Sequence, residues 1–252
     1  MPADILYLGD TTLETAAGYL AGVIAHAKWQ FDYVPSHESP SMELIESRRK
    51  LFILSDYPAN RLPNAAQTEV AKQVEQGAGL LMIGGWESFQ GSGGLWRGTA
   101  ISELLPVEID ANDDRRNCDS PVFAVQEADH EILSGLPWQG RTPLIGGYNA
   151  VTVKDGSHLL LTARRYSAQI DGETPALTVV SWDPLLAVRE HGDGRVAALM
   201  TDLAPHWVGP LVDWGNGRVS AQAPGAEAIE VGNHYAQFVK QLLAWTGRLD
   251  IG

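Results

Sequence analysis

Several polar and aromatic side chains in this 252-residue sequence stand directly after short apolar runs. Asp56 follows the run LFIL at 51–54, and Asp202 follows the run VAALM at 196–200. If these runs are buried strands of a parallel sheet, their carboxyl ends share one edge, and ligands bind at that edge in open α/β sheets. Besides Asp202, we therefore predict ligand-binding roles for the residues at and after these strand ends: Asp56, Tyr57, Gly84, Gly85, Trp86, Ser88 and Trp207.

Asp202 and His206 suggest a catalytic pair in the same region. A carboxylate beside an imidazole is the arrangement that a general base requires. The pair Gly84-Gly85 permits close backbone approach, and free amides at this position would suit an anion or an oxyanion. A structural contact between Asp202 and His206, and a tight turn at the two glycines, are the alternatives.

Three other groups of residues are weaker candidates for a functional site. Asp129, His130 and Glu131 are adjacent, so their side chains do not converge on one ion, and we predict no metal site. Cys118 is the only cysteine, and it lies among charges of both signs rather than at a strand end. The glycine-rich stretch 90–98 lacks the Gly-Lys-Ser/Thr ending of a phosphate-binding loop, so we predict no cofactor.

The pattern of apolar residues indicates how these groups are positioned. Strands and helices alternate over the first 85 residues, with Thr11 and Thr12 expected to cap the first helix. The second half is rich in expected strands, with turns at Asp155-Gly156 and at 191–194. We predict one α/β domain over residues 1–252, flavodoxin-like and doubly wound, with a mostly parallel sheet and a strand-rich elaboration in the second half. The predicted strands are 4–9, 29–34, 51–54, 80–83, 148–153, 159–162, 176–181, 184–190 and 195–201, and the predicted helices include 41–49, 63–76 and 233–246.

Composition and net charge argue against some classes of binding partner. The net charge of −13 argues against binding nucleic acid or anionic membranes. The amino-terminal residues resemble no secretory signal, and no apolar run is long enough to span a bilayer, so a cytoplasmic location is expected. Six of the eight tryptophans fall in expected loops or near strand ends: Trp86, Trp96, Trp138, Trp182, Trp207 and Trp214. Aromatic residues in loops can form a carbohydrate-stacking or subunit surface, but we expect most of these six to pack in the interior.

The ordered series of motifs resembles the class I glutamine amidotransferase-like superfamily, in particular a glutamine amidotransferase-like branch related to trehalose-utilisation-type proteins. The matching segments are LFILSDYP at 51–58, VEQGAGLLMIGGWESF at 74–89, ISELLPVEI at 101–109, ADHEILSGLPW at 128–138 and GDGRVAALMTDLAPHW at 192–207, followed by the terminal helix.

This resemblance implies a flavodoxin-like core with its functional site at the strand ends. Enzymes of the superfamily hydrolyse glutamine with a cysteine on the elbow after a central strand, together with a later histidine and glutamate. Here the matching elbow, 83–86, reads IGGW, and His206 is followed by Trp-Val. We therefore expect no thiol mechanism, since this elbow offers no thiolate.

Three functions remain open at this point. The first is a divergent amidotransferase-like protein that binds a small polar ligand, such as a carbohydrate, at the strand ends. The second is a hydrolase that uses Asp202 and His206 as its base. The third is a non-catalytic protein that assembles into a homo-oligomer.

Overall fold

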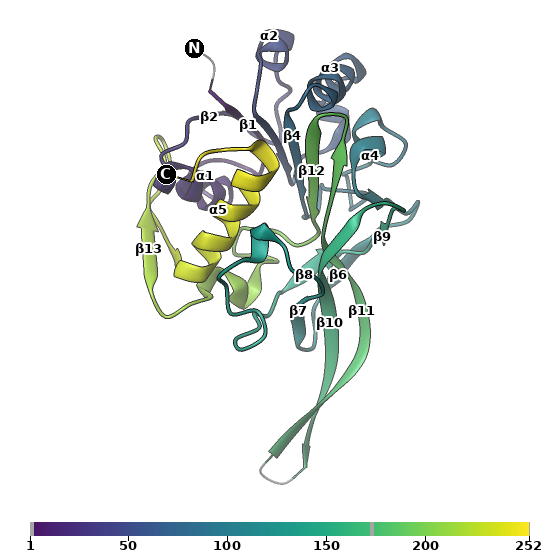
Figure 1. Ribbon diagram of the computed structural model, residues 1–252, viewed down its shortest axis with the longest axis vertical. Coiled ribbons are helices and arrows are strands. Elements are labelled where there is room, and N and C mark those ends of the chain that lie inside the picture. Colours follow the sequence, from purple (N-terminus) through teal and green to yellow (C-terminus); the bar gives the residue numbers. More distant parts are fainter. Residues whose placement is uncertain (1–2, 172–173, 252) are drawn as a thin grey trace.

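The computed structural model describes residues 3–171 and 174–251, and an eight-stranded sheet runs through them (Figure 1). Its strands lie in the order β2-β1-β3-β4-β12-β11-β10-β7. The five strands from β2 to β12 are parallel, and the last three are each antiparallel to their neighbour. The predicted α/β fold with a mostly parallel sheet is confirmed. The bounds are β1 Ile5–Gly9, β2 Phe31–Val34, β3 Leu51–Ser55, β4 Gly79–Ile83, β7 Val122–Gln126, β10 His158–Asp171, β11 Thr174–His191 and β12 Gly194–Leu199.

The order of the strands creates a crevice between β1 and β3. From β1 the chain passes to β2 on one side, and it then returns to β3 on the other side of β1. Since such crossovers are right-handed, the connecting helices α1 and α2 lie on opposite faces of the sheet. Strands that leave in opposite directions open a crevice at their carboxyl ends, which is where ligands bind in this class of fold.

The helices cover both faces of the parallel strands. Helices α1 and α5 pack together, and α5 lies against β3, β4 and β12. Helices α2 and α3 pack together, and α3 also contacts α4. Because both faces are covered, every residue of β1, β3 and β4 is buried, as continuous apolar strands require. The bounds are α1 Ala17–His26, α2 Met42–Glu46, α3 Asn64–Glu75, α4 Ala100–Leu104 and α5 Asn233–Gly247.

Local sequence signals fix several of the helix ends. The hydroxyl of Ser41 accepts a hydrogen bond from the amide of Leu44 at 3.2 Å and caps α2. Thr99 and Ser102 form a reciprocal capping box at the start of α4. The predicted cap of α1 is wrong: the helix begins only at Ala17, without a side-chain cap. The carbonyl of Thr12 instead accepts the amide of Thr15 in a preceding turn, and this turn lines the candidate site described below.

The strand-rich half departs from prediction in several places. The predicted strands 176–181 and 184–190 form one continuous strand, β11, and the predicted strand 159–162 is part of the longer β10. The predicted strand 148–153 is two short strands that pair with different partners, and Asp155-Gly156 does not join a hairpin, because the second of these strands pairs with β5 rather than with β10. The hairpin of β13 and β14 was not predicted. The remaining strands are β5 Val107–Glu108, β6 Arg115–Asn117, β8 Gly147–Asn149, β9 Thr152–Val153, β13 Arg218–Ala221 and β14 Ile229–Gly232, and the 3-10 turns are Ala59–Arg61, Glu131–Leu133 and Gly209–Asp213.

Within the described ranges, none of the helices has the length and apolar character needed to cross a membrane.

Candidate functional site

A cavity of about 540 Å³ opens at the carboxyl ends of β1, β3 and β12. It therefore lies at the crevice that the strand order creates. Three aspartates line it, one from the residues after each of these strands: Asp10, Asp56 and Asp202. The turn before α1, the loop that carries His206 and the segment leading into β14 close its other sides.

Asp10 is held in place by the ends of two neighbouring strands. Its amide donates to the carbonyl of Ser55 at 2.7 Å, and its carboxylate accepts a hydrogen bond from the hydroxyl of Tyr7. Burial raises the pKa of Asp10 to about 7, and the nearby charge of Asp56 adds to this effect. A carboxyl group with such a pKa exchanges its proton near neutral pH, which suits both proton transfer and ligand binding.

Asp56 is anchored over the turn that follows β4. Its carboxylate accepts the backbone amide of Glu87 at 2.5 Å, and its own amide donates to the hydroxyl of Ser88 at 3.0 Å. Burial still raises the pKa of the Asp56 carboxyl, although these amides and the nearby imidazole of His206 act in the opposite direction. Gly85 allows this arrangement, because a Cβ there would lie 2.5 Å from the Asp56 carboxylate.

Asp10 and Asp56 share an unusual backbone conformation. Their φ angles are +52° and +46°, in the left-handed region that non-glycine residues seldom adopt. Each stands directly after a buried strand, so the change in backbone direction that this conformation produces falls at the strand end. Backbone strain of this kind is concentrated at binding and catalytic sites.

Asp202 is buried to nearly the same degree as Asp10, with an exposed fraction of 7% against 5%. Its carboxylate accepts the amide of Ala204 at 2.9 Å, while the hydroxyl of Tyr235 in α5 donates to the carbonyl of Leu203 at 2.6 Å and fixes this loop. Burial raises the pKa of the Asp202 carboxyl well above its ordinary value, and the neighbouring charge of Asp10 raises it further. Removing these carboxyl groups from water without a cationic partner costs free energy. They therefore favour binding protons or the hydrogen-bond donors of a ligand.

An exposed row of side chains extends from the cavity. His206 lines the cavity, and its ring lies 5.8 Å from the ring of Trp86. The guanidinium carbon of Arg115, a half-buried residue, lies 4.7 Å from the centre of the same Trp86 ring. Trp86 is 42% exposed and thus offers a flat aromatic surface beside the cavity.

The other predicted ligand residues lie outside the cavity lining. Tyr57 is buried, with its hydroxyl donating to the carbonyl of Glu38 at 2.8 Å. The indole of Trp207, also buried, donates to the side chain of Asn117 at 2.9 Å. The amide of Gly84 donates to the carbonyl of Leu199 at 2.7 Å, and the amide of Gly85 to the side chain of Asn149 at 3.0 Å. The free oxyanion donors that the sequence suggested are therefore already paired within the protein.

Ser88 supports the site rather than lining it. Its buried hydroxyl donates to the carbonyl of Ile83 at 2.5 Å and accepts the amide of Asp56. We expect Ser88→Ala to lower the free energy of unfolding by about 1–3 kcal/mol, because it leaves both backbone groups unpaired. Urea unfolding measures this loss. The exposed Ser92 in the same loop gives the matched control, and an equal loss in Ser92→Ala would contradict the role of Ser88.

The predicted Asp202–His206 pair is not joined by a hydrogen bond in the part of the chain that the structure describes. The nearby imidazole of His206 lowers the pKa of Asp56, whereas the charge of Asp10 raises the pKa of Asp202. Across residues 3–171 and 174–251, no three His, Cys, Asp or Glu side chains are placed to hold a metal ion. The arrangement thus favours a cluster of carboxyl groups facing a cavity over a charge-relay pair or a metal centre.

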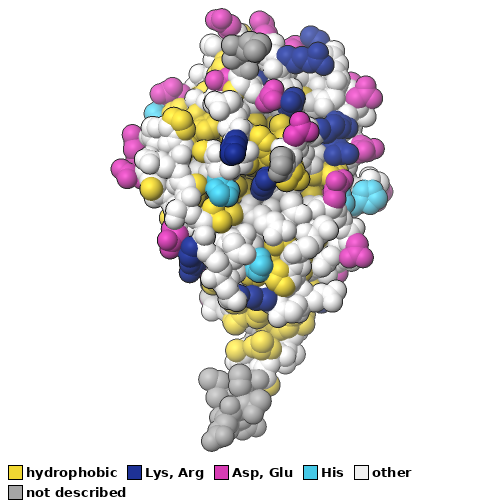
Figure 2. Space-filling model, turned by 60° about the vertical axis from the view of Figure 1, so that its left-hand side comes forward, with side chains coloured by type: hydrophobic (Ala, Val, Ile, Leu, Met, Phe, Trp, Pro, Cys, Tyr) yellow, Lys and Arg dark blue, Asp and Glu magenta, His cyan; other side chains and the backbone are white. Residues whose placement is uncertain are grey.

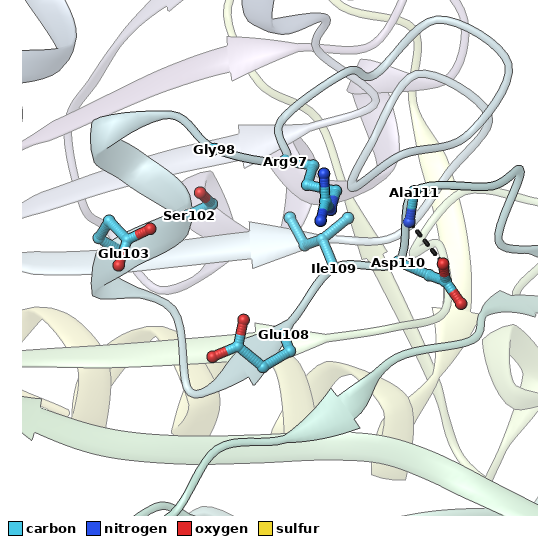
Figure 3. A pocket seen from close by; sticks show the side chains of 8 residues that line it. All are labelled: Arg97, Gly98, Ser102, Glu103, Glu108, Ile109, Asp110 and Ala111. Carbon is cyan, nitrogen blue, oxygen red and sulfur yellow. Dashed lines mark hydrogen bonds between the residues drawn. The ribbon is translucent and has the colours of Figure 1, made fainter.

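A second hollow and the single cysteine lack the buried carboxyl groups that mark the candidate site. A hollow of about 440 Å³ beside α4 is lined by Arg97, Glu103, Glu108 and Asp110, whose charged groups are exposed and spread around it (Figure 3). Cys118 is half-buried next to β6, where burial raises the pKa of its thiol to about 11. A thiol with such a pKa stays protonated at neutral pH and is a poor nucleophile.

Sequence reasoning recognised Gly9-Asp10 as a strand end but did not assign Asp10 to the ligand site. The repeated pattern of a small residue and then aspartate, at 9–10 and 55–56, was the available signal. Glu227, which lines the far side of the cavity, could not be found in this way. Its position depends on the β13–β14 hairpin, which is remote in sequence from the three aspartates.

One of three comparisons with known proteins identifies a family. The profile of a family described as "Putative glutamine amidotransferase" matches residues 7–219. Among solved structures, the chain is similar to the cytoplasmic protein STM1381 from Salmonella typhimurium LT2, with 24% identity, a TM-score of 0.73, and coverage of 96% of this chain and 98% of that one. It is also similar to the cytoplasmic protein STM3548 from Salmonella typhimurium, with 22% identity, a TM-score of 0.71 and the same coverage of both chains.

A more distant similarity is to the N-terminal domain of mmIFT52, with 16% identity, a TM-score of 0.60, and coverage of 98% of this chain and 99% of that one. At these identities the similarities concern the fold. A comparison with curated proteins gives no match.

Proposed function

The chain belongs to this glutamine amidotransferase-like family, and on that premise we propose that it binds a small polar ligand in the cavity at the carboxyl ends of β1, β3 and β12. The observation that carries the proposal is the convergence of Asp10, Asp56 and Asp202 on one cavity, with pKa values raised in all three. Clustered carboxyl groups with raised pKa values in a cleft are typical of functional sites.

The chemistry of the lining favours a ligand with several hydroxyl or amine groups. Carboxylates accept hydrogen bonds from such groups, and charge-assisted bonds of this kind are about twice as strong as neutral ones. The hydroxyls of Thr11, Thr15 and Tyr19 line the same cavity and add both donors and acceptors. Trp86 adds an aromatic face at the rim, and a sugar ring matches this combination of carboxyl groups and an exposed indole.

Hydrolysis of glutamine by a thiolate is not part of this proposal. Gly84 and Gly85 occupy the elbow after β4, and Cys118 lies instead beside β6 with a raised pKa. The carboxyl cluster supplies a different kind of reactivity.

One observation favours a second function, a hydrolase with a carboxyl group as its general acid or base. The pKa of Asp10 is about 7, which is near the optimum for proton transfer at neutral pH, and the charge of Asp10 raises the pKa of a second buried carboxyl group, Asp202. In this second function, Asp10 and Asp202 donate and accept the proton that is transferred during hydrolysis, and His206 lies at the rim of the cavity. Substrate turnover that disappears in Asp10→Asn while the ligand still binds would support the hydrolase.

A thermal-shift experiment tests the binding proposal. Wild-type protein is heated with glucose, trehalose, inositol or glutamine, each at 10 mM. A compound present at 100 times its Kd stabilises the protein by about 2.7 kcal/mol, which corresponds to a rise in Tm of roughly 5–10 °C for a chain of this size. We expect this rise to be lost in Asp56→Asn, because the variant keeps the anchor to Glu87 but removes the charge.

The exposed Asp155 provides the control for that experiment, since Asp155→Asn removes the same charge far from the cavity lining. A rise in Tm that is equal in wild type, Asp56→Asn and Asp155→Asn would place the binding elsewhere. The absence of a rise with all four compounds would contradict the proposed class of ligand.

A further inference from the structure

The hairpin of β10 and β11 extends far beyond the rest of the molecule (Figure 1). Leu186 in β11 pairs with Leu199, the last residue of β12, so residues 174–185 run past the end of that strand. At about 3.3 Å per residue, this stretch spans about 40 Å. The ladder between β10 and β7 ends at Arg165, and the amide of Tyr166 donates to the carbonyl of Pro121 at 2.9 Å. From Ser167 on, the described residues of β10 pair with β11. We call residues 166–171 and 174–182 the arm.

The arm exposes large apolar side chains. Leu177, Val179, Val180 and Trp182 are 49%, 49%, 61% and 59% exposed, and they make up half of the eight large exposed apolar residues in the described chain. The space-filling view shows hydrophobic side chains gathered on this narrow extension (Figure 2). A two-stranded ribbon is at best marginally stable in water, so an arm with this composition gains stability when another surface covers it.

The charge of the chain indicates what covers the arm. Residues 166–170 and 174–182 contain no Asp, Glu, Lys or Arg, whereas the whole chain carries a net charge of −13. Two copies of so acidic a chain repel one another over much of their surfaces. Apart from Asp171, the arm is therefore an uncharged stretch on which two copies can approach closely.

We propose that the arms of two copies of this chain pack against each other and form a two-fold symmetric dimer, with β11 beside the second copy's β11. An antiparallel pair of identical strand edges is self-complementary, as a two-fold interface requires. The carbonyl of Leu185 still accepts the amide of Met200 at 2.9 Å. From Pro184 back to Thr174, the described outer edge of β11 has no strand partner and carries no lysine of the kind that blocks strand pairing. Pro184 has no amide hydrogen, so the pairing would stop before it.

The size of the arm limits this interface to less than the standard size, because edge-to-edge pairing can cover at most the two faces of the arm. A ribbon of about nine residue pairs is about 30 Å long and about 10 Å wide, so its two faces together present roughly 600 Å². Each partner in a stable interface of standard size contributes about 800 Å². The register shift between Arg165 and Tyr166 leaves Val180 without a partner in β10, which turns an additional apolar side chain outward for contact.

Sedimentation equilibrium of the full chain tests the proposal. We expect wild-type protein at 50 μM to have twice the chain mass of 27.3 kDa, and the double variant Val180→Lys/Trp182→Lys to have the mass of one chain. Thr178→Lys is a second variant, which adds a charge to the exposed arm without removing an apolar side chain. It should weaken the dimer at least tenfold while leaving the circular dichroism spectrum unchanged.

The matched control is Met42→Lys, which adds a lysine at another exposed apolar residue, on α2 at the opposite end of the molecule from the arm (Figure 1). It should dimerise as the wild type does. Wild-type protein that is monomeric at 50 μM would overturn the proposal and leave the arm to a different protein. A dimer that survives in both arm variants would overturn it as well, since the contact would then lie on another surface.

Discussion

At pH 8, Asp10→Asn is expected to unfold with a free energy about 4 kcal/mol higher than wild type, and this advantage should shrink toward zero at pH 4. The gain arises because the variant no longer places an ionised carboxyl group in a buried environment. The asparagine oxygen can still accept the hydrogen bond from Tyr7, so the change removes charge while preserving that contact.

The direction follows from the two pKa values of the carboxyl group. In the folded protein the pKa of Asp10 is about 7, whereas an aspartate in an unfolded chain has a pKa of about 3.9. Between these values the folded protein keeps a proton that the unfolded chain has released. The stability of the wild type that depends on Asp10 is therefore fully present below about pH 4, falls as the pH rises, and is lost above about pH 7.

Urea unfolding of wild type and Asp10→Asn at pH 4, 6 and 8 measures this effect. Asp155→Asn serves as the control, since Asp155 is exposed and should give a constant difference near zero. Parallel stability curves for wild type and Asp10→Asn across these pH values would show that the Asp10 carboxyl group is not held in a buried, strained environment.

Gly9→Ala is expected to be the most damaging single substitution at the site, with a loss of at least 4 kcal/mol or failure to fold. Gly9 has a φ of +137°, and a Cβ there would lie 1.7 Å from the carbonyl oxygen of Ser55. The same carbonyl accepts the amide of Asp10, so β1 and β3 approach closely at the point where both aspartates leave their strands. An added methyl group forces these strand ends apart.

The variant Gly98→Ala distinguishes the effect of this steric clash on stability from the effect of backbone strain. Gly98 also has a positive φ, +74°, but a Cβ there would meet no atom within 4 Å. It should therefore cost only about 1 kcal/mol. Thermal unfolding of both variants measures the difference, and equal losses would mean that the close approach of β1 and β3 contributes nothing.

The parallel half of the fold could be predicted because its strands are buried on both faces. Such strands are continuous apolar runs in the sequence, as at 51–54 and 80–83, and the segments between them have helical spacing. The strand-rich half was harder to predict, because pairing there depends on contacts remote in sequence. Asp155-Gly156 has the composition of a hairpin turn, yet β9 pairs with β5, about 45 residues earlier in the chain.

The site residues, too, could be predicted from the sequence only in part. Asp56, Asp202 and His206 were predicted from their places after buried strands, and the structure brings all three to one cavity. Tyr57 and Trp207 follow the same rule of position, but their side chains turn into the core, which a position in the sequence cannot reveal. The arm was predicted only in part: residues 176–181 were expected to form a strand, but β10 and β11 extend well beyond the predicted strands 159–162 and 176–181.

Carbon-13 NMR of the aspartate carboxyl groups tests the central claim most directly. With aspartate labelled at its side-chain carboxyl carbon, the signals of Asp10, Asp56 and Asp202 can be assigned through their asparagine variants. We predict that Asp10 titrates near pH 7 and that a compound that raises the Tm shifts these three signals but leaves that of the exposed Asp155 unchanged. A compound that binds without moving any of the three signals would contradict a ligand site at the carboxyl ends of β1, β3 and β12.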